Sequence, residues 1–177
     1  MNKDLEKIIF DEKQIDNIIS NVSSKINNDY KNKEPLFIGL LKGAIPFMTD
    51  LVKKINLKCF VDYIKVSSYN GSESTGNIKI NGHIPDVKDK DIIIIDDILD
   101  TGLTLLNLKK LFEDNGAKSI KIAVLLDKKE GRKYNIEADY KGSICPNEFI
   151  VGYGLDYNDK YRNLPYIAIL KREVYSR

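Results

Sequence analysis

The sequence has 177 residues and a mass of 20.2 kDa, which is enough for one domain with a substantial core and too little for two typical domains. Apolar residues make up 42% and charged residues 31%, a composition typical of globular proteins and not of disordered chains. The 28 Lys and Arg residues nearly balance the 26 Asp and Glu residues, and the net charge of +2 argues against a dedicated nucleic-acid or membrane-surface binder. We therefore expect a single domain over 1–177.

Cysteine, histidine and hydropathy patterns exclude further classes. Two cysteines, Cys59 and Cys145, cannot form a disulfide framework, and we expect both as buried free thiols. A single histidine, His83, leaves little for a zinc site or a Ser-His-Asp triad. No apolar run approaches the ~20 residues of a membrane-spanning helix, and the first residues lack the pattern of a secretory signal. These features predict a cytoplasmic protein without a membrane segment.

Hydrophobic patterns alternate between the helical and the strand period along the chain. Asp11 and Gln14 resemble a capping box ahead of isoleucines at helical spacing, and the run 35–41 is apolar without interruption, as in strands buried on both faces. In chain order the patterns predict helix 11–28, strand 35–41, helix 44–55, strands 59–68, 78–80 and 91–95, a helix from about 104 to its C-cap Gly116, and strands 119–126 and 149–153. The polar segment 68–77 is expected to be a hairpin tip or a lid. The alternation predicts an α/β fold with a mainly parallel central sheet flanked by helices.

The most informative stretch begins with four isoleucines in the strand 91–95. Asp96 and Asp97 are expected at the carboxyl end of this strand, where α/β proteins bind their ligands. The segment DTGLT at 100–104 then leads into a helix, and its small residues and hydroxyls suit a phosphate at the helix N-terminus. Paired acids at such a position suit Mg²⁺ or the hydroxyls of a ribose.

Two other interpretations of this stretch stay open on the residues alone. The acids could be solvated turn and cap residues, or they could bind Mg²⁺ and accept a phosphoryl group, as in receiver domains. A receiver domain has no need of the Thr-Gly-Leu-Thr segment that follows. A Walker A loop is excluded because no G-x-x-x-x-G-K-[ST] pattern is present.

The segment IIIIDDILDTGLTL at 92–105 resembles the phosphoribosyl diphosphate signature of type I phosphoribosyltransferases. Four further segments extend the resemblance to the hypoxanthine-guanine phosphoribosyltransferases over most of the chain: LLKG at 40–43, SSY at 67–69, LLDKK at 125–129 and FIVGYGLDYNDKYRNLPYI at 149–167. One departure is Asp96, where many family members have Glu. The resemblance implies a type I phosphoribosyltransferase fold, in which a small hood and a flexible lid loop accompany the central sheet.

The resemblance also implies roles on the sugar-phosphate side of the site. Asp100 would be the general base that takes a proton from the purine ring. The 5′-phosphate would be held by Thr101, Gly102, Leu103 and Thr104. Asp96 and Asp97 would face the ribose hydroxyls and their Mg²⁺, and Asp156 would reach a second Mg²⁺ through water. Pyrophosphate would be bound by Lys42, Gly43, Ser68, Tyr69 and Arg162, with a non-proline cis peptide before the lysine.

A second group of residues is implied to bind the purine. Lys128 would read the oxygen at C6, because an ammonium group only donates hydrogen bonds. Phe149 or Tyr153 would stack on the base, of which the resemblance favours Phe149. Ile150 would contribute backbone groups, and Asp156 would also lie at the purine. The neighbouring Lys129 and Arg132 are expected to be solvated.

The resemblance thus implies an Mg²⁺-dependent enzyme of purine salvage. It would convert phosphoribosyl diphosphate and hypoxanthine or guanine into IMP or GMP and pyrophosphate, as a homodimer or homotetramer. The alternative is a regulator of the same fold that binds nucleotide or RNA without chemistry. The presence of both Asp100 and Lys128 and the low net charge favour the enzyme. Preference among hypoxanthine, guanine and xanthine depends on distances around the purine C2 position, which the sequence does not fix.

Overall fold

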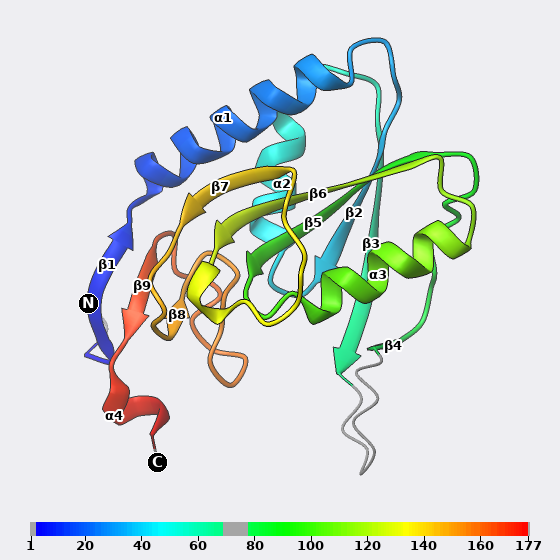
Figure 1. The fold of residues 1–177 in the computed structure, drawn as a ribbon. Helices are drawn as coiled ribbons and strands as arrows, with labels where there is room; N and C mark the ends of the chain where they lie inside the picture. The colour runs from blue at the N-terminus through cyan, green and yellow to red at the C-terminus, as the bar shows by residue number, and fades with distance from the viewer. Residues whose placement is uncertain (1–2, 69–77, 177) are drawn as a thin grey trace.

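The computed structural model describes residues 3–68 and 78–176, which form two sheets and the helices packed against them (Figure 1). In chain order the elements are β1 (Leu5–Phe10), α1 (Glu12–Asp29), β2 (Leu36–Leu41), α2 (Ile45–Lys53), β3 (Phe60–Ser68), β4 (Ile78–Ile80), β5 (Asp91–Leu99), α3 (Leu103–Asp114), β6 (Ser119–Asp127), the 3₁₀ turn η1 (Lys129–Gly131), β7 (Tyr140–Ile144), β8 (Ile150–Val151), β9 (Ile167–Leu170) and α4 (Arg172–Tyr175). No helix among the described residues is long and apolar enough to cross a membrane.

The larger sheet has the strand order β4-β3-β2-β5-β6-β7, and every neighbouring pair is parallel except β3 with β4. Its central strands are apolar on both faces, since helices cover both, and Ile92 to Ile95 are completely buried. The chain leaves β2 toward β3 on one side, whereas β5, β6 and β7 follow one another on the other side. The direction of winding therefore reverses between β2 and β5, which is where open α/β sheets bind ligands.

Strand β5 is longer than the sequence predicted. Its extra residues border the space between the carboxyl ends of β2 and β5, which we call the opening. The strand was expected to end at residue 95, but it continues through the two acids to Leu99. Pairing with β2 stops at Gly39 and Ile95, whereas pairing with β6 continues to Leu99 and Asp127. Asp96 and Asp97 therefore lie in a strand that keeps a partner on one side only, beside the gap where β2 has turned away.

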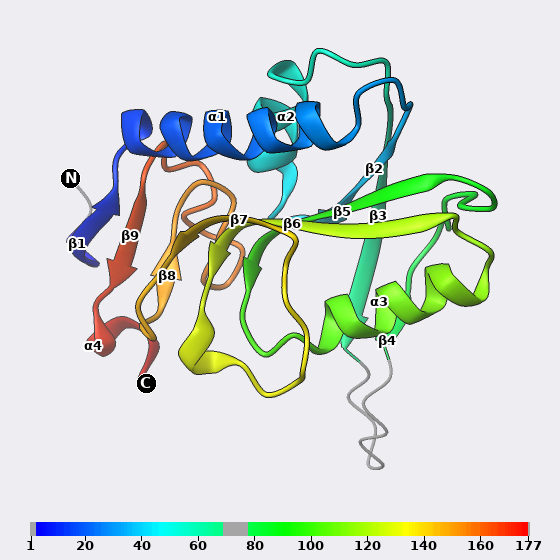
Figure 2. The same cartoon turned by 45° about the horizontal axis from the view of Figure 1, so that its top comes forward.

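Helices cover both faces of the larger sheet. In Figure 2, α1 and α2 lie on one face and α3 lies on the other. The predicted capping box at the start of α1 is confirmed, because Asp11 Oδ1 accepts the Gln14 N–H at 2.8 Å and Gln14 Oε1 accepts the Asp11 N–H at 2.9 Å. Helix α3 ends at Asp114 with Asn115 as its C-cap, one residue before the predicted Gly116, which follows with a φ of 80°.

A smaller antiparallel sheet, in the order β1-β9-β8, forms the hood that the family resemblance implied. Strands β1 and β9 were not predicted, although they pair from Leu5 with Leu170 to Phe10 with Ile167. Strand β8 is only Ile150–Val151 and not 149–153, because Gly152 and Tyr153 take positive φ angles of 100° and 49° and turn the chain. The hood thus pairs strands from near both ends of the described chain, and the loop between β8 and β9 brings Gly154 against Gly43 after β2.

Candidate active site

The loop after β2 and the acids of β5 approach each other across the opening. The peptide bond before Lys42 is cis, as the resemblance implied. A Cβ added to Gly43 would collide with the Asp97 carboxylate, and a Cβ added to Gly154 would collide with the Gly43 carbonyl oxygen. Glycine is therefore required at both positions, since three chain segments meet there without room for a side chain.

The adjacent carboxyl groups of Asp96 and Asp97 are half-buried in this opening. Asp96 Oδ1 accepts the Asp97 N–H at 3.0 Å, and Asp97 Oδ1 accepts the Ile98 N–H at 2.9 Å. Burial and the charge of Asp97 raise the pKa of Asp96 well above its usual value. Burial also raises the pKa of Asp97, although hydrogen bonds and the charge of Arg162 oppose that rise. Burial therefore makes these two adjacent carboxylates costly to ionise, and a bound cation would offset that cost.

Residues 96–105 enclose a small polar hollow of about 90 Å³ at the start of α3. Gly102, with a φ of 91°, precedes the first residue of the helix and supplies no side chain to cap it. The Leu103 N–H donates to Thr101 Oγ1 at 3.5 Å, and the other N–H groups of the first turn favour an anion. The hydroxyl-bearing Thr101 and Thr104 line the same hollow. All four residues of the predicted phosphate segment, including Leu103 as the first residue of α3, therefore belong to one turn.

Asp100 and Lys128 meet beside this hollow. The Lys128 ammonium lies 3.7 Å from Asp100 Oδ2 and donates to the Glu148 carbonyl oxygen at 3.1 Å. The Lys128 side chain is 15% exposed, whereas that of Asp100 is 45% exposed and remains open to a ligand. A Cβ added to Gly131 would collide with Asp100 Oδ1, so the turn after Lys128 packs directly on the carboxylate. Two groups that are 28 positions apart in the chain are thus adjacent at one edge of the sheet.

The other predicted cations gather around two acids in the loop after β8. Arg162 contacts Asp156 Oδ1 at 2.7 Å and Asp159 Oδ1 at 3.0 Å, and the Lys42 ammonium contacts the same Asp159 oxygen at 3.0 Å. Arg162 also donates to the Gly154 carbonyl at 2.7 Å. Lys42 and Arg162 therefore converge as predicted. Asp159, which sequence reasoning missed, is the acid that both cations share.

The aromatic residues considered for stacking point to different places. The Phe149 ring stacks on Tyr175 of α4 with centroids 4.9 Å apart, and it meets the edge of Tyr157 at 5.5 Å. Tyr153 points instead into a cavity between α1 and α2, where its hydroxyl donates to Asp50 at 2.6 Å. Tyr153 is therefore not placed for stacking on a base beside Lys128. Ile150 is buried in β8, where its backbone pairs with β9.

Two expectations about individual side chains are wrong. Arg132 is not solvated, because its side chain is only 13% exposed and bonds to four groups of the protein. Cys59 is half-buried and not buried, whereas Cys145 is buried as expected and its burial raises the thiol pKa to about 11. Of the predicted lid residues, Ser68 ends β3, whereas Tyr69 and the rest of the lid lie outside the described residues.

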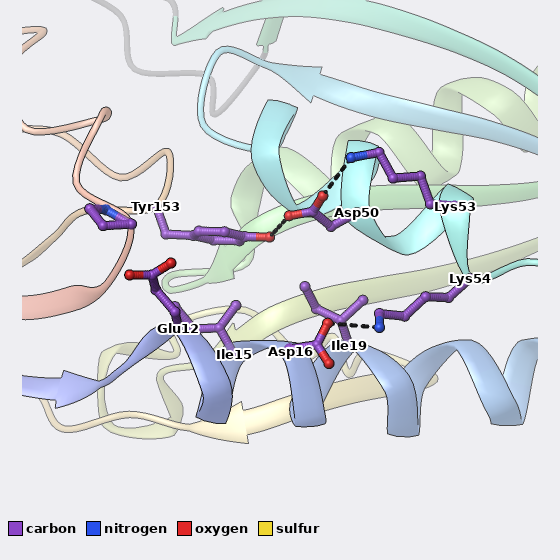
Figure 3. A pocket seen from close by; sticks show the side chains of 9 residues that line it. Glu12, Ile15, Asp16, Ile19, Asp50, Lys53, Lys54 and Tyr153 are labelled. Carbon is purple, nitrogen blue, oxygen red and sulfur yellow. Dashed lines mark hydrogen bonds and ion pairs between the residues drawn. The ribbon is translucent and has the colours of Figure 1, made fainter.

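A larger cavity, of about 650 Å³, lies away from these groups between α1 and α2 (Figure 3). Four of its five charged groups are already paired, since Asp50 accepts from Tyr153 and Lys53, and Asp16 contacts Lys54 at 2.7 Å; Glu12 is the exception. Its lining residues include no adjacent acids and no glycine, and the first turn of α1, which borders it at Glu12, is already capped by Asp11. Size alone therefore does not identify the site, and the edge between β2 and β5 remains the candidate.

Comparisons with known proteins show the family of this chain. The phosphoribosyl transferase domain family matches residues 7–158. A hypoxanthine-guanine phosphoribosyltransferase of Streptococcus pneumoniae is 46% identical over 99% of both chains. The crystal structure of a Staphylococcus aureus hypoxanthine phosphoribosyltransferase superposes with a TM-score of 0.94 at 44% identity, covering 98% of this chain and 96% of that one. A Trypanosoma cruzi hypoxanthine phosphoribosyl transferase gives a TM-score of 0.93 at 36% identity, covering 99% and 96%.

Proposed function

This chain belongs to the phosphoribosyltransferase family, and from that premise we propose that it transfers the 5-phosphoribosyl group of phosphoribosyl diphosphate to hypoxanthine or guanine. The products are IMP or GMP and pyrophosphate, so the enzyme acts in purine salvage. The observation that carries the assignment is the meeting of Lys128 and Asp100 at 3.7 Å beside the hollow at the start of α3. A lysine that recognises the purine, a general base and a phosphate-binding turn are thereby available to one bound nucleotide.

Asp100 is the general base in this proposal, and Lys128 recognises the purine. The exposed carboxylate of Asp100 is open to the purine ring, from which it accepts a proton as the bond to the ribose forms. The Lys128 ammonium has only donors, so it pairs with an oxygen at C6 and not with the amino group of adenine. Phe149 lies one residue beyond the Glu148 carbonyl that holds Lys128, which supports its role against the face of the base. Ile150 and Asp156 complete the predicted purine side.

The phosphates bind on either side of these two residues. The turn Thr101–Thr104 holds the 5′-phosphate with backbone N–H groups and hydroxyls. Lys42, Gly43 and Arg162 hold the pyrophosphate, with Ser68 and Tyr69 from the predicted lid. Binding of pyrophosphate replaces the carboxylate of Asp159, which otherwise bridges Lys42 and Arg162. Positive charge held in place at the leaving group is the kind of stabilisation that favours a transition state in which that group departs as an anion.

The residues at the opening fit Mg²⁺ as the cofactor. Asp96 and Asp97 are adjacent oxygen donors, and burial raises the pKa of both carboxyl groups. Among the described residues no three acidic, His or Cys side chains converge on a cation site. Protein sites for Mg²⁺ often supply only one or two carboxylates and take the remaining ligands from substrate phosphates and water. A bound Mg²⁺ would neutralise charge on the diphosphate, and Asp156 would help to hold a second ion.

The test is a spectrophotometric assay that contains phosphoribosyl diphosphate, Mg²⁺ and one of four purines in turn: hypoxanthine, guanine, xanthine or adenine. Product is expected with hypoxanthine and guanine and not with adenine, and EDTA is expected to abolish it without changing the circular dichroism spectrum. Absence of product with every 6-oxopurine would refute the assignment. We place the reaction in the cytoplasm and propose that residues 1–177 act as one domain in a homodimer or homotetramer.

A further inference from the structure

The segment from Asp127 to Ile136 wraps around the loop that carries Asp100. Three consecutive carbonyl oxygens of that loop accept hydrogen bonds from it. The Leu99 oxygen accepts the Lys128 N–H at 3.0 Å, and the Thr101 oxygen accepts the N–H groups of Lys133 and Tyr134, both at 3.1 Å. The oxygen of Asp100 itself accepts from the Arg132 side chain at 2.9 Å. The backbone on both sides of the proposed base is therefore held by the segment that follows the purine-reading lysine.

The Arg132 guanidinium is the centre of this arrangement. Besides the Asp100 oxygen, it donates to the Leu99 oxygen at 3.1 Å, to the Ile136 oxygen at 2.6 Å and to the Asp127 carboxylate. Four acceptors are thus met by one rigid, planar fork, which lysine cannot reproduce with a single ammonium group. Its aliphatic part also closes on the phosphate turn, because a Cβ on Gly102 would lie 3.2 Å from Arg132 Cδ.

The Asp127 carboxylate supplies the negative charge that holds the Arg132 guanidinium in place. Its side chain is completely buried at the end of β6, directly before Lys128 in the chain. Asp127 Oδ2 has no hydrogen-bond partner, and the only cation near it in the described residues besides Arg132 is Lys141, 3.7 Å away. A buried carboxylate of this kind is retained only with a charged partner, because its desolvation is costly.

From this geometry we propose that Asp127 and Arg132 are a positioning pair for the reaction, which sets the Asp100 carboxylate and the Lys128 ammonium relative to the phosphate turn. The inference rests on the proposed function and adds two residues to it. Neither side chain is among those assigned above to the substrate, and the Arg132 guanidinium is held by groups of the protein. Their effect is exerted through the Leu99 and Asp100 carbonyls on one side and through the Asp127–Lys128 peptide on the other.

The pair acts on turnover more than on binding of phosphoribosyl diphosphate. Proton transfer requires the base to lie within hydrogen-bond reach of the purine, and a displacement of ~1 Å can cost about 10²-fold in rate. The 5′-phosphate and pyrophosphate are held mainly by the turn 101–104 and by the cations near Asp159, which the pair does not replace. Loss of the fork should therefore lower kcat while it leaves the affinity for phosphoribosyl diphosphate largely intact.

The test begins with Arg132→Lys, which keeps the charge next to Asp127 and removes the fork. We expect kcat with hypoxanthine to fall by about 10-fold or more, while KM for phosphoribosyl diphosphate stays within about threefold. Calorimetric titration with phosphoribosyl diphosphate and Mg²⁺ should still give one site per chain. A merely structural role would lower the binding stoichiometry and the apparent kcat together.

A second variant covers the case in which Arg132→Lys does not fold. Asp127→Asn combined with Arg132→Gln removes both buried charges and retains side chains of similar size, so no unpaired charge remains in the interior. The same loss of kcat per bound site is expected. Lys129→Ala, which changes an exposed residue of the same segment, is the matched control and should retain the wild-type kcat.

The outcomes separate this inference from the proposed function. If the wild-type protein forms no IMP from hypoxanthine, the proposed function itself is wrong. If the wild type is active and Arg132→Lys, or the double variant, retains kcat within about twofold, the positioning role is overturned. If the variants lose phosphoribosyl diphosphate sites in proportion to activity, the pair serves folding alone and the inference is again overturned.

Discussion

The small hollow at the end of β5 and the large cavity between α1 and α2 differ in what lines them. The hollow of about 90 Å³ is formed by a turn with a positive-φ glycine, by Asp100 and by the first turn of α3. The cavity of about 650 Å³ in Figure 3 is bordered by two ion pairs, Asp50 with Lys53 and Asp16 with Lys54, and by Glu12. The cations of the candidate site are paired as well, Lys42 and Arg162 with Asp159 and Lys128 with Asp100, so pairing does not separate the two places. Convergence of the backbone at the end of β5, and not volume, marks the site, and the effects expected of the following substitutions depend on that distinction.

The largest effect is expected in the discrimination against adenine. When adenine binds, the Lys128 ammonium faces the amino group of the base, so two hydrogen-bond donors meet. Sites built to pair a donor with the C6 oxygen discriminate against adenine by ~10⁴-fold or more in kcat/KM. Lys128→Gln should weaken the use of hypoxanthine and narrow this gap, because an amide can present a donor or an acceptor. Steady-state assays with both purines measure the ratio. Wild-type turnover of adenine at the rate of hypoxanthine would remove Lys128 from its assigned role.

The second-largest effect is expected in kcat when the proposed general base, Asp100, is replaced. Asp100→Asn keeps the shape of the side chain and loses the proton acceptor, so kcat should fall by ~10²-fold or more. Affinity for phosphoribosyl diphosphate should change much less, because the phosphates are held by the turn 101–104 and by the cations across the site. Stopped assays and calorimetric titration give the two quantities. A variant that turns over near the wild-type rate would show that another group takes the proton.

A smaller effect, on stability, is expected at Asp96 and Asp97. Their pKa values are raised in the folded protein, so between the unfolded and folded values the folded state binds more protons. The free energy of unfolding of the apoprotein should therefore fall as pH rises through that range, and the ionised pair should be unfavourable at neutral pH. In EDTA at pH 7, Asp97→Asn should raise the free energy of unfolding by about 1–2 kcal/mol, a gain that disappears near pH 4.

Urea denaturation of both proteins across pH 4–8 measures this difference. Activity with Mg²⁺ should fall in the same variant, since the charge that is unfavourable in the apoprotein is the charge that a bound cation needs. Asp62→Asn, at a half-buried acid on β3 that pairs with His83, is the control for loss of a carboxylate elsewhere. A destabilised Asp97→Asn protein at neutral pH would contradict the account of a pair that is costly to ionise.

The sequence predicted the elements whose signal is local and missed those that depend on distant partners. The isoleucines of β5 and the capping box of α1 are readable without tertiary structure. Strands β1, β7 and β9 are short or lie at sheet edges, and YKGSI of β7 has little apolar character of its own. It forms a strand because β6 offers its free edge. Such pairing overrides local propensity, and no window of sequence contains both partners.

The residues of the candidate site likewise divide into those with a recognisable sequence signal and those without one. Asp100, Lys128 and the phosphate turn were found because their residue types resemble a known signature, and the fold brings them together. Arg132 was misjudged because arginines are mostly exposed, and its acceptors are main-chain oxygens that carry no residue-specific signal. Asp127 gave a faint signal as an acid at the end of an apolar strand. Asp159 gave none, because its bridging of Lys42 and Arg162 depends on where a loop returns.

The smallest effect on activity is expected in the large cavity, and it sharpens the comparison with the hollow. Tyr153→Phe removes the hydroxyl that donates to Asp50 and leaves the ring in place. Asp50 keeps its contact with Lys53 at 3.0 Å, so the carboxylate is not left without a partner, and the free energy of unfolding should fall by only about 1 kcal/mol. Turnover of hypoxanthine should stay within about twofold of wild type, because no group in that cavity meets the proposed substrates. A loss of kcat as large as that of Asp100→Asn would mean that the cavity belongs to the working site, and that convergence of the backbone at the end of β5 is a poor ground for excluding it.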